Sequence, residues 1–160
     1  MTSSALSVHR TTTTDPLARP LLDELAYEYT TRYGSSEDLS RYPAQEFAPP
    51  QGAFLLLLEQ GRPVAGGAYR RYDEHTAELK RIWTHSAHRR RGLARRVLTV
   101  LEREATDRGY TRIYLTTGPR QPEAKGLYLA TGYRPLFDVG AEPESLGLLP
   151  FEKHLETPKP

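Results

Sequence analysis

Apolar and polar positions along the chain follow two different periods. Alternation, or a short continuous apolar run, predicts strands over residues 5–10, 54–59, 64–72, 77–84, 111–116 and 146–155. Apolar residues spaced three or four apart predict helices over 16–32, from Arg91 or Gly92 to about Arg108, and over 122–130. The proline-rich segment 33–51 is predicted to be a loop with one short helix near 36–41. This order of elements indicates a mixed α/β fold.

The connections between these elements predict how the strands pair. Short polar turns at 60–63 and 73–75 join three strands into an antiparallel meander. Strand 77–84, the long helix and strand 111–116 form one crossover unit, which places those two strands parallel. With 160 residues, the chain suits a single domain over 1–160, with a frayed tail at 157–160.

Composition excludes several classes of protein. The chain has 38% hydrophobic residues and no cysteine, which excludes disulfides, thiolate metal sites and cysteine nucleophiles. Its longest apolar run covers residues 53–58 and is far shorter than the ~20 residues of a membrane span. No signal-peptide pattern opens the sequence. We therefore expect a cytoplasmic protein without a membrane partner.

Basic residues concentrate at one predicted strand-to-helix junction. Seven basic residues and no acidic one lie between Lys80 and Arg96, although the whole chain has a net charge of only +2. The first amides of a helix have no intrahelical partner, and the helix dipole adds partial positive charge there. Basic side chains surround these amides: Arg89, Arg90, Arg91, Arg95 and Arg96. The pattern indicates a phosphate or pyrophosphate site rather than a nucleic-acid surface, which needs a broad basic face.

Two sequence motifs connect this junction to a known family. The stretch Arg89-x-x-Gly92-x-Ala94 resembles the [QR]-x-x-G-x-[GA] motif of the GNAT superfamily of N-acetyltransferases, and Leu127-Tyr128-x-x-x-Gly132-Tyr133 resembles a second element near that family's C-terminus. The strand 77–83 is similar to the family strand that precedes the first motif. The resemblance covers residues 54–136. It implies a GNAT-like domain whose mixed, mostly antiparallel twisted sheet has about six to seven strands and about four flanking helices.

The resemblance also implies a co-substrate, acetyl-CoA, and residues that hold it. The backbone of Ile82, Trp83 and Thr84 would pair with the pantetheine arm. The pyrophosphate would be wrapped by Arg89, Arg90, Arg91, Gly92, Leu93, Ala94 and Arg95. Gln121 stands where the family often has an asparagine seven residues before its tyrosine. No metal is implied, because His85 and His88 lack an evident third ligand.

Acetyl transfer to an amine needs a proton acceptor and an acid for the departing thiolate. Tyr128 is the candidate acid, because a phenol is protonated at neutral pH. The alternative for Tyr128 is ordinary core packing. Glu78 is the candidate base, and period-two alternation places it on one strand face with Ile82 and Thr84. The alternative for Glu78 is a charge pair with Lys80 or a nearby arginine. A second family branch uses a glutamate at the position of Thr116, which cannot act as a base.

The acceptor remains open at this level. The segment 27–51 offers an arginine–tyrosine set that suits a carboxylate (Tyr29, Arg32, Tyr33, Arg41, Tyr42) and an acidic set that suits a cationic amine (Glu28, Glu37, Asp38, Glu46). We favour acetylation of a primary amine on a small molecule by direct attack in a ternary complex. The alternatives are a protein lysine or N-terminal acetyltransferase and a non-catalytic CoA-binding sensor. A homodimer is compatible with the family, and no nucleic-acid partner is expected.

Overall fold

A single twisted sheet forms the centre of the protein. The computed structural model describes residues 5–156, and within them seven strands pair in the order β1-β2-β3-β4-β5-β7-β6. The strands are β1 Leu6–Arg10, β2 Ala53–Glu59, β3 Arg62–Asp73, β4 Thr76–Thr84, β5 Arg112–Thr117, β6 Arg134–Pro135 and β7 Leu149–His154. Every neighbouring pair is antiparallel except β4 and β5, which are parallel. The predicted meander and crossover unit are both confirmed.

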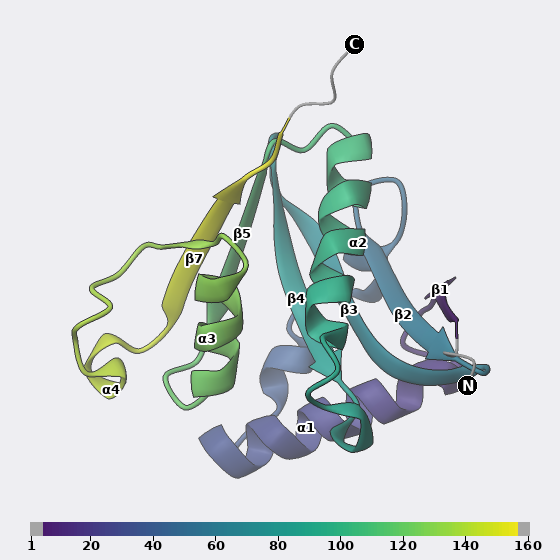
Figure 1. The fold of residues 1–160 in the computed structure, drawn as a ribbon, viewed down its shortest axis with the longest axis horizontal. Coiled ribbons are helices and arrows are strands. Elements are labelled where there is room, and N and C mark those ends of the chain that lie inside the picture. The colour runs from purple at the N-terminus through teal and green to yellow at the C-terminus, as the bar shows by residue number, and fades with distance from the viewer. Residues whose placement is uncertain (1–4, 157–160) are drawn as a thin grey trace.

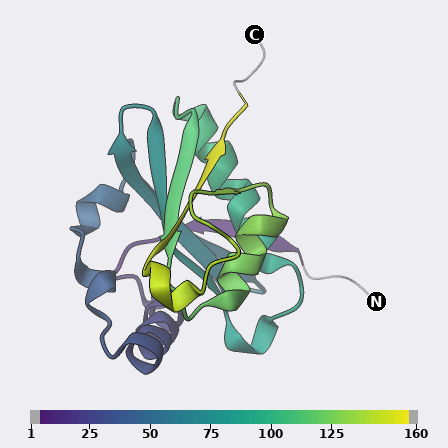
Figure 2. The same cartoon turned by 90° about the vertical axis from the view of Figure 1, so that its left-hand side faces the viewer.

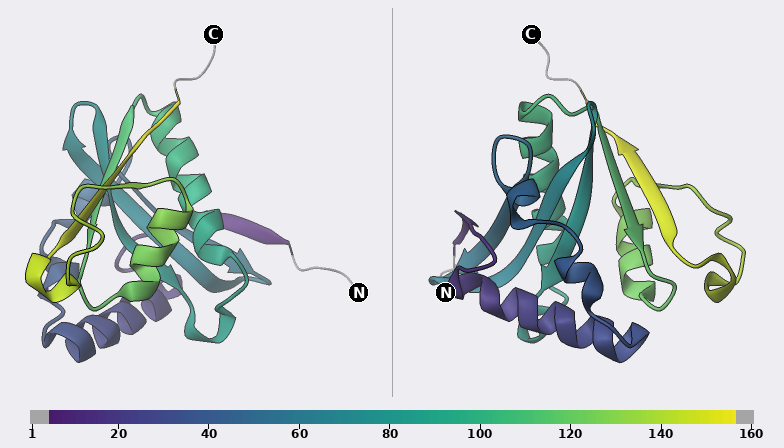
Figure 3. Two further views of the ribbon diagram at one scale, coloured as in Figure 1. Left: turned by 60° about the vertical axis from the view of Figure 1, so that its left-hand side comes forward. Right: turned by 180° about the vertical axis from the view of Figure 1, so that it is seen from behind.

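Helices cover the two faces of the sheet unequally. The α-helices are α1 Arg19–Tyr33, α2 Leu93–Asp107, α3 Pro122–Ala130 and α4 Pro143–Leu146, and 3-10 helices occupy Pro16–Ala18, Glu37–Ser40, Ala44–Phe47 and Ser86–His88. Helices α2 and α3 lie on one face, and α1 crosses the other (Figures 1 and 3). Figure 2 shows the segment between α1 and β2 on the side of the sheet opposite α3. The predicted fold class is thus confirmed.

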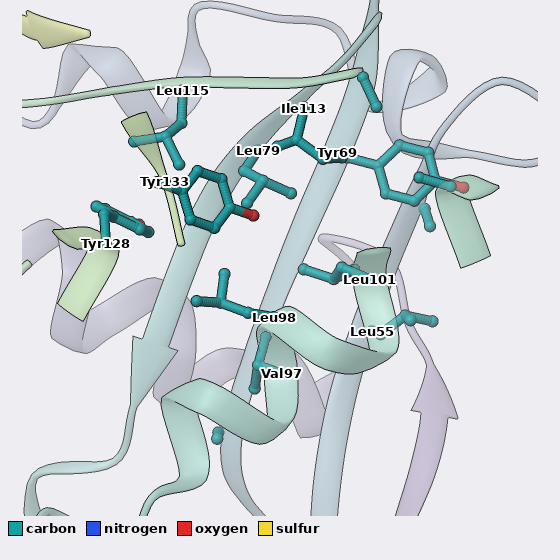
Figure 4. Close-up of a cluster of buried hydrophobic side chains, with 14 of the residues drawn as sticks. Leu55, Tyr69, Leu79, Val97, Leu98, Leu101, Ile113, Leu115, Tyr128 and Tyr133 are labelled. Atoms are coloured by element: carbon teal, nitrogen blue, oxygen red, sulfur yellow. The ribbon is translucent and has the colours of Figure 1, made fainter. Parts of the chain in front are cut away.

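Each face of the sheet has its own apolar cluster. Helix α2 buries one continuous stripe of side chains: Leu93, Val97, Leu98, Leu101 and Ala105. These residues pack with alternate positions of the strands and with Tyr128 and Tyr133, and we call this group the α2-side cluster (Figure 4). The α1-side cluster consists of Ala18, Leu21, Leu25, Phe47, Phe54, Leu56, Ala68 and Trp83. Alternation along each strand therefore sends neighbouring residues into different clusters.

Two adjacent glycines in β3 allow helices to approach the sheet closely on both sides. A Cβ at Gly67 would lie 2.7 Å from the Ile82 side chain and 3.0 Å from Val97 and Leu101. A Cβ at Gly66 would lie 2.8 Å from Leu56 and 3.0 Å from Leu21 of α1. A Cβ atom this close would force the neighbouring side chains to shift. The helices can therefore pack this closely only because glycine has no side chain.

Strands β4 and β5 pair only at one end. Their register covers Thr76–Glu78 and Arg112–Tyr114, and beyond these residues the strands separate towards the lower end of Figure 1. The antiparallel partner on the other side, β3, loses register with β4 between Gly66 and Ala68. Opposite this shift, Arg81 has a φ of +59°, so β4 has a β-bulge there.

The bulge overturns one prediction from alternation. Up to Lys80, even-numbered residues of β4 point to the α1 side, where Lys80 lies over the Tyr42 ring. Arg81 points to the same side and stacks over Phe47, while Ile82 packs against the α2-side cluster. The prediction that Glu78, Ile82 and Thr84 share one face is therefore wrong, because one extra residue inverts the alternation.

Several predicted boundaries shift for local reasons. The first helix begins with a 3-10 turn and becomes α1 at Arg19, with Pro20 in its first turn. Helix α2 begins at Leu93 because Gly92, its N-cap, has a φ of +73°. The last strand begins at Leu149 rather than residue 146, because α4 occupies the preceding residues. The tail 157–160 lies outside the described residues. Within residues 5–156, no helix is long and apolar enough to span a membrane.

Candidate active site

A cavity of about 710 Å³ lies where β4 and β5 separate. Its wall combines residues from both faces of the sheet, including Leu79, Ile82, Ala124 and Tyr128 from the α2 side and Leu39, Tyr42, Phe47 and Lys80 from the α1 side. The cavity therefore passes through the gap in the sheet. Its volume falls within the range of small-molecule sites, about 300–1,000 Å³.

Tyr128 lies on the cavity wall at the α2 side. It is 6% exposed, and its ring centroid lies 5.5 Å from those of both Tyr133 and Phe151. Figure 4 shows Tyr128 beside Tyr133 and Leu115. Burial, with a smaller effect from Tyr29, raises the pKa of Tyr128 above its ordinary value, so the phenol keeps its proton at neutral pH. Tyr128 is thus a packed residue that also faces the cavity, and the two interpretations of it are compatible.

Glu78 is a buried carboxylate on the same cavity wall. It is 5% exposed, and its Oε1 accepts a hydrogen bond of 2.8 Å from Arg70. The Lys80 ammonium lies 3.8 Å from Oε2. Arg70 also donates to Glu46 at 2.7 Å, so it bridges two carboxylates. Glu78 is therefore paired with Lys80 and an arginine, as its alternative interpretation expected. The carboxylate is nevertheless buried and lines the cavity.

The basic junction between β4 and α2 forms a turn of unusual backbone geometry. Arg90 and Gly92 have φ values of +64° and +73°. The first helical hydrogen bond runs from the Arg96 amide to the Gly92 carbonyl at 3.2 Å, so the amides of Leu93, Ala94 and Arg95 have no partner within the helix. A Cβ at Gly92 would meet nothing within 4 Å, so the requirement there is conformational.

The arginine side chains of this turn do not act alike. Arg91 is ion-paired with Glu59 of β2, and its Nη1 lies 2.9 Å from His88 Nδ1. Burial raises the pKa of Glu28 on α1, and the charges of Arg32 and Arg89 oppose that rise. The charge of Arg89 also acts on Glu123 of α3, whereas the Arg91 side chain is paired with the end of β2.

The predicted site residues fall into two groups. Glu78, Ile82, Gln121 and Tyr128 line the cavity, whereas Trp83, Thr84 and residues 89–95 are not part of its wall. Residues 89–95 form the turn before α2 and the first residues of that helix. The Trp83 side chain belongs to the α1-side cluster, which leaves only its backbone for a ligand. Gln121 Oε1 accepts hydrogen bonds of 3.1 Å from both the Tyr33 hydroxyl and the Gly118 amide. That oxygen holds the loop before α3 against α1.

Sequence reasoning missed several cavity residues. Tyr72, Tyr114 and Leu148 line the wall, and the rings of Tyr72 and Tyr114 lie 4.8 Å apart. Tyr114 was detectable, because the alternation that buries Ile113 and Leu115 sends it to the opposite face. Tyr72 and Leu148 follow only from the register shift of β3 between Arg71 and Asp73 and from the position of the loop after α4. The wall also includes six residues that the sequence analysis did name, five for the acceptor pocket and one at the alternative base position: Tyr29, Tyr33, Glu37, Arg41, Tyr42 and Thr116.

Glu24 was also missed, and it anchors α1 to the end of β4. Its Oε1 accepts hydrogen bonds from Trp83 Nε1 at 2.9 Å and from the Ser86 amide at 3.0 Å. Its Oε2 accepts from the Ser86 hydroxyl. Partial burial acts to raise the pKa of Glu24, but the hydrogen bonds from Ser86 and Trp83 outweigh it, so the pKa lies below the ordinary value.

We expect Glu24→Gln to lower the free energy of unfolding at pH 7 by roughly 1–2 kcal/mol, because it removes charge-assisted hydrogen bonds. A lowered pKa in the folded state stabilises the protein above the ordinary carboxyl pKa, and this stabilisation is lost as the pH falls. The difference between variant and wild type should therefore shrink below about pH 4. Urea unfolding at pH 7 and pH 3.5 measures both values, and an equal difference at both pH values would contradict the ionic role of Glu24.

The two histidines of the turn make local contacts. His85 Nδ1 accepts a hydrogen bond of 3.0 Å from the Ala87 amide, and the rings of His85 and His88 lie 5.4 Å apart. Among residues 5–156, no cluster of three or more His, Asp or Glu side chains suits a metal ion.

The chain is similar to proteins of one known family. The sequence model of the Acetyltransferase (GNAT) family matches residues 20–133, and the chain belongs to that family. It is therefore an acyltransferase of the N-acetyltransferase class.

Individual relatives are consistent with this assignment. The "Uncharacterized N-acetyltransferase YsnE" of Bacillus subtilis is 36% identical, over 62% of this chain and 78% of that protein. A structure from Klebsiella pneumoniae, provisionally assigned as an acyl-CoA N-acyltransferase, is 27% identical with a TM-score of 0.74, over 96% of this chain and 100% of that one. A GNAT-family acetyltransferase from Elizabethkingia anophelis, solved with acetyl-CoA bound, is 17% identical with a TM-score of 0.69, over 94% of this chain and 98% of that one. At 17% identity, this similarity shows only that the two proteins share a fold.

Proposed function

We propose that this protein transfers the acetyl group of acetyl-CoA to a primary amine on a small molecule, by direct attack in a ternary complex. The observation behind this proposal is the cavity that passes through the sheet between β4 and β5. Tyr128 reaches it from the α2 side, while Tyr42 and Lys80 reach it from the α1 side. Two reactants can therefore enter from opposite faces and meet at the gap.

The turn before α2 fits the diphosphate of acetyl-CoA. The unpaired amides of residues 93–95 and the positive end of the α2 dipole favour an anion, and Arg89, Arg90 and Arg95 add charge. Beyond Glu78, the edge of β4 that faces β5 has left the ladder, so the backbone of Ile82, Trp83 and Thr84 is available to an extended ligand. Bound acetyl-CoA supplies an activated thioester.

The reaction requires two proton movements. The amine nitrogen forms a bond to the acetyl carbon, and the bond from that carbon to sulfur breaks. The amine loses a proton, for which Glu78 is the proposed acceptor, directly or through water. The sulfur gains a proton, which the buried and protonated Tyr128 is proposed to donate.

The walls of the cavity favour a small acceptor over a protein. Arg32 Nη1 donates to the Arg120 carbonyl at 2.8 Å, and Arg120 Nη1 donates to the Arg32 carbonyl at 2.7 Å. These reciprocal bonds, together with that from Tyr33 to Gln121, join the end of α1 to the loop before α3. Tyr33 and Gln121 line the cavity, so this connection borders one side of it, whereas a protein substrate needs an open groove.

The experiment that tests transfer is release of free CoA from acetyl-CoA across a panel of amino acids, polyamines, aminoglycosides and peptides. We expect release with at least one class of small amine, and mass spectrometry should find the acetylated amine. Release with peptides alone would favour the protein acetyltransferase. Binding of acetyl-CoA without release for any amine would favour the CoA sensor.

Binding of acetyl-CoA by the turn before α2 can be tested at Gly92, and Gly109 at the other end of the helix provides the matched control. Gly92→Ala should weaken acetyl-CoA binding about five- to thirtyfold, because a left-handed conformation costs a residue with a side chain about 1–2 kcal/mol and the free turn can relax away from it. Gly109 also has positive φ, +96°, and open space around it. Gly109→Ala should lower stability similarly but leave binding unchanged. Calorimetric titration measures both, and equal affinities for the two variants would contradict the assignment of the turn.

A further inference from the structure

Lys80 is a half-buried cation of the cavity wall whose hydrogen-bonding capacity is not used. Its side chain is 14% exposed. The Glu78 carboxylate lies 3.8 Å from its ammonium, beyond hydrogen-bond length, and the centroid of the Tyr42 ring lies 5.1 Å away. Within residues 5–156, the ammonium makes no hydrogen bond, although it has three donors.

The neighbouring arginines differ from Lys80 in this respect. Arg70 donates to Glu46 and to Glu78 at 2.7 and 2.8 Å. Arg81 donates to the Leu39 carbonyl at 3.0 Å and stacks over Phe47 and Phe54. Both guanidinium groups therefore donate hydrogen bonds to the protein, whereas the Lys80 ammonium donates none within the described chain and lies on the cavity wall.

The charges on the cavity wall also favour an anionic ligand. Three cationic side chains and two acidic ones line it, a formal excess of one positive charge: Arg41, Lys80 and Arg81 against Glu37 and Glu78. The acidic Glu78 is already paired with Arg70. A ligand carboxylate would therefore meet more positive than negative side chains on this wall.

The position of Lys80 relative to Tyr128 fixes which part of the acceptor it would meet. Lys80 stacks on Tyr42, which packs against the α1-side cluster, whereas Tyr128 belongs to the α2-side cluster. An acceptor that directs its amine through the gap towards Tyr128 leaves its other end on the α1 side. That end lies beside Lys80.

We propose that the acceptor is a primary amine that carries a carboxylate, and that Lys80 binds this carboxylate. The proposal rests on the proposed function, because it assigns the acceptor of that same reaction. Lys80 acts as a specificity-determining residue, and it takes no part in proton transfer.

The test compares amino acids with their primary amides, which keep the amine and lose the negative charge. The wild type should acetylate the acids with kcat/KM about ten- to a hundredfold above the matched amides, as expected for one charge-assisted contact. Lys80→Met should remove this preference by raising KM for the acids alone, and Lys80→Arg should restore most of it. Lys125→Met is the matched control, because the Lys125 ammonium also lies over an aromatic ring, at 5.8 Å from the Phe137 centroid, but Lys125 does not line the cavity.

Binding to CoA-saturated protein, measured by calorimetry, separates this inference from the proposed function. Tighter binding of acids than of amides, abolished by Lys80→Met, supports the inference even if no acetyl group is transferred. Acetylation of amides as efficient as that of acids overturns it while transfer stands. A Lys80→Met variant that weakens acids and amides equally overturns it, as does the absence of saturable binding for every acid in the panel.

Discussion

Tyr128→Phe should lower kcat for acetyl transfer by about a hundredfold or more, while the dissociation constant of acetyl-CoA stays within about twofold of wild type. The ring and its packing against Tyr133 and Phe151 remain, and only the hydroxyl group with its acidic proton is lost. Because burial raises the pKa of Tyr128, wild-type kcat should not fall through loss of this proton anywhere below the ordinary tyrosine value of about 10. Steady-state kinetics from pH 6 to 10 and calorimetry measure these quantities.

Tyr133→Phe is the control for this prediction. Its ring lies next to Tyr128 and is also buried, but its hydroxyl donates to Glu102 Oε2 at 2.7 Å and does not line the cavity. Loss of this hydroxyl should reduce stability and leave kcat close to wild type. Equal kcat for Tyr128→Phe and wild type would show that another group, or water, protonates the sulfur.

Arg70→Met should lower the free energy of unfolding by about 3 kcal/mol, because removing one partner of a buried ion pair leaves the other charge uncompensated. Glu78 and Glu46 would both lose their guanidinium partner. The remaining Lys80 ammonium is 3.8 Å from Glu78, so we expect the lower end of the usual range of about 3–5 kcal/mol. Urea unfolding at pH 7 provides the measurement.

An exposed ion pair provides the comparison for Arg70. Arg19 and Asp23 lie one turn apart on α1 at 3.6 Å, and their side chains are 60% and 64% exposed. Arg19→Met should change stability by no more than about 0.5 kcal/mol, since solvent screens such pairs. If Arg70→Met were equally mild, Lys80 alone would be sufficient to balance the Glu78 charge.

Local sequence patterns were sufficient for most of the fold. The apolar spacing of α2 and the proline and glycine around α3 act over a few residues, so those helices were predicted nearly to the residue. Among the features that escaped prediction are helix α4, the short strand β6, which has only two residues, and the bulge at Arg81. The bulge has no local pattern, because it depends on how β4 pairs with β3.

The candidate site, like the fold, was only partly predictable from the sequence. The glycine at position 92, the arginines around it and the placement of Tyr128 in its motif were visible along the chain. The partners of the charged groups were not: Arg70 on Glu78, Arg91 on Glu59 and Glu24 on Trp83 join residues 8, 32 and 59 positions apart.

By itself, the sequence determined the family, the order of strands and helices, and the turn that precedes α2, since each depends on residue types at short spacing. Only the tertiary structure decided what lines the cavity, because its wall comes from segments brought together when β4 and β5 separate. Through one inserted residue at Arg81, it also decided the faces on which the later side chains of β4 lie, and it turned Ile82 towards the α2-side cluster. Lys80 precedes that residue and keeps the face that it shares with Glu78, where its charge bears on the choice of acceptor.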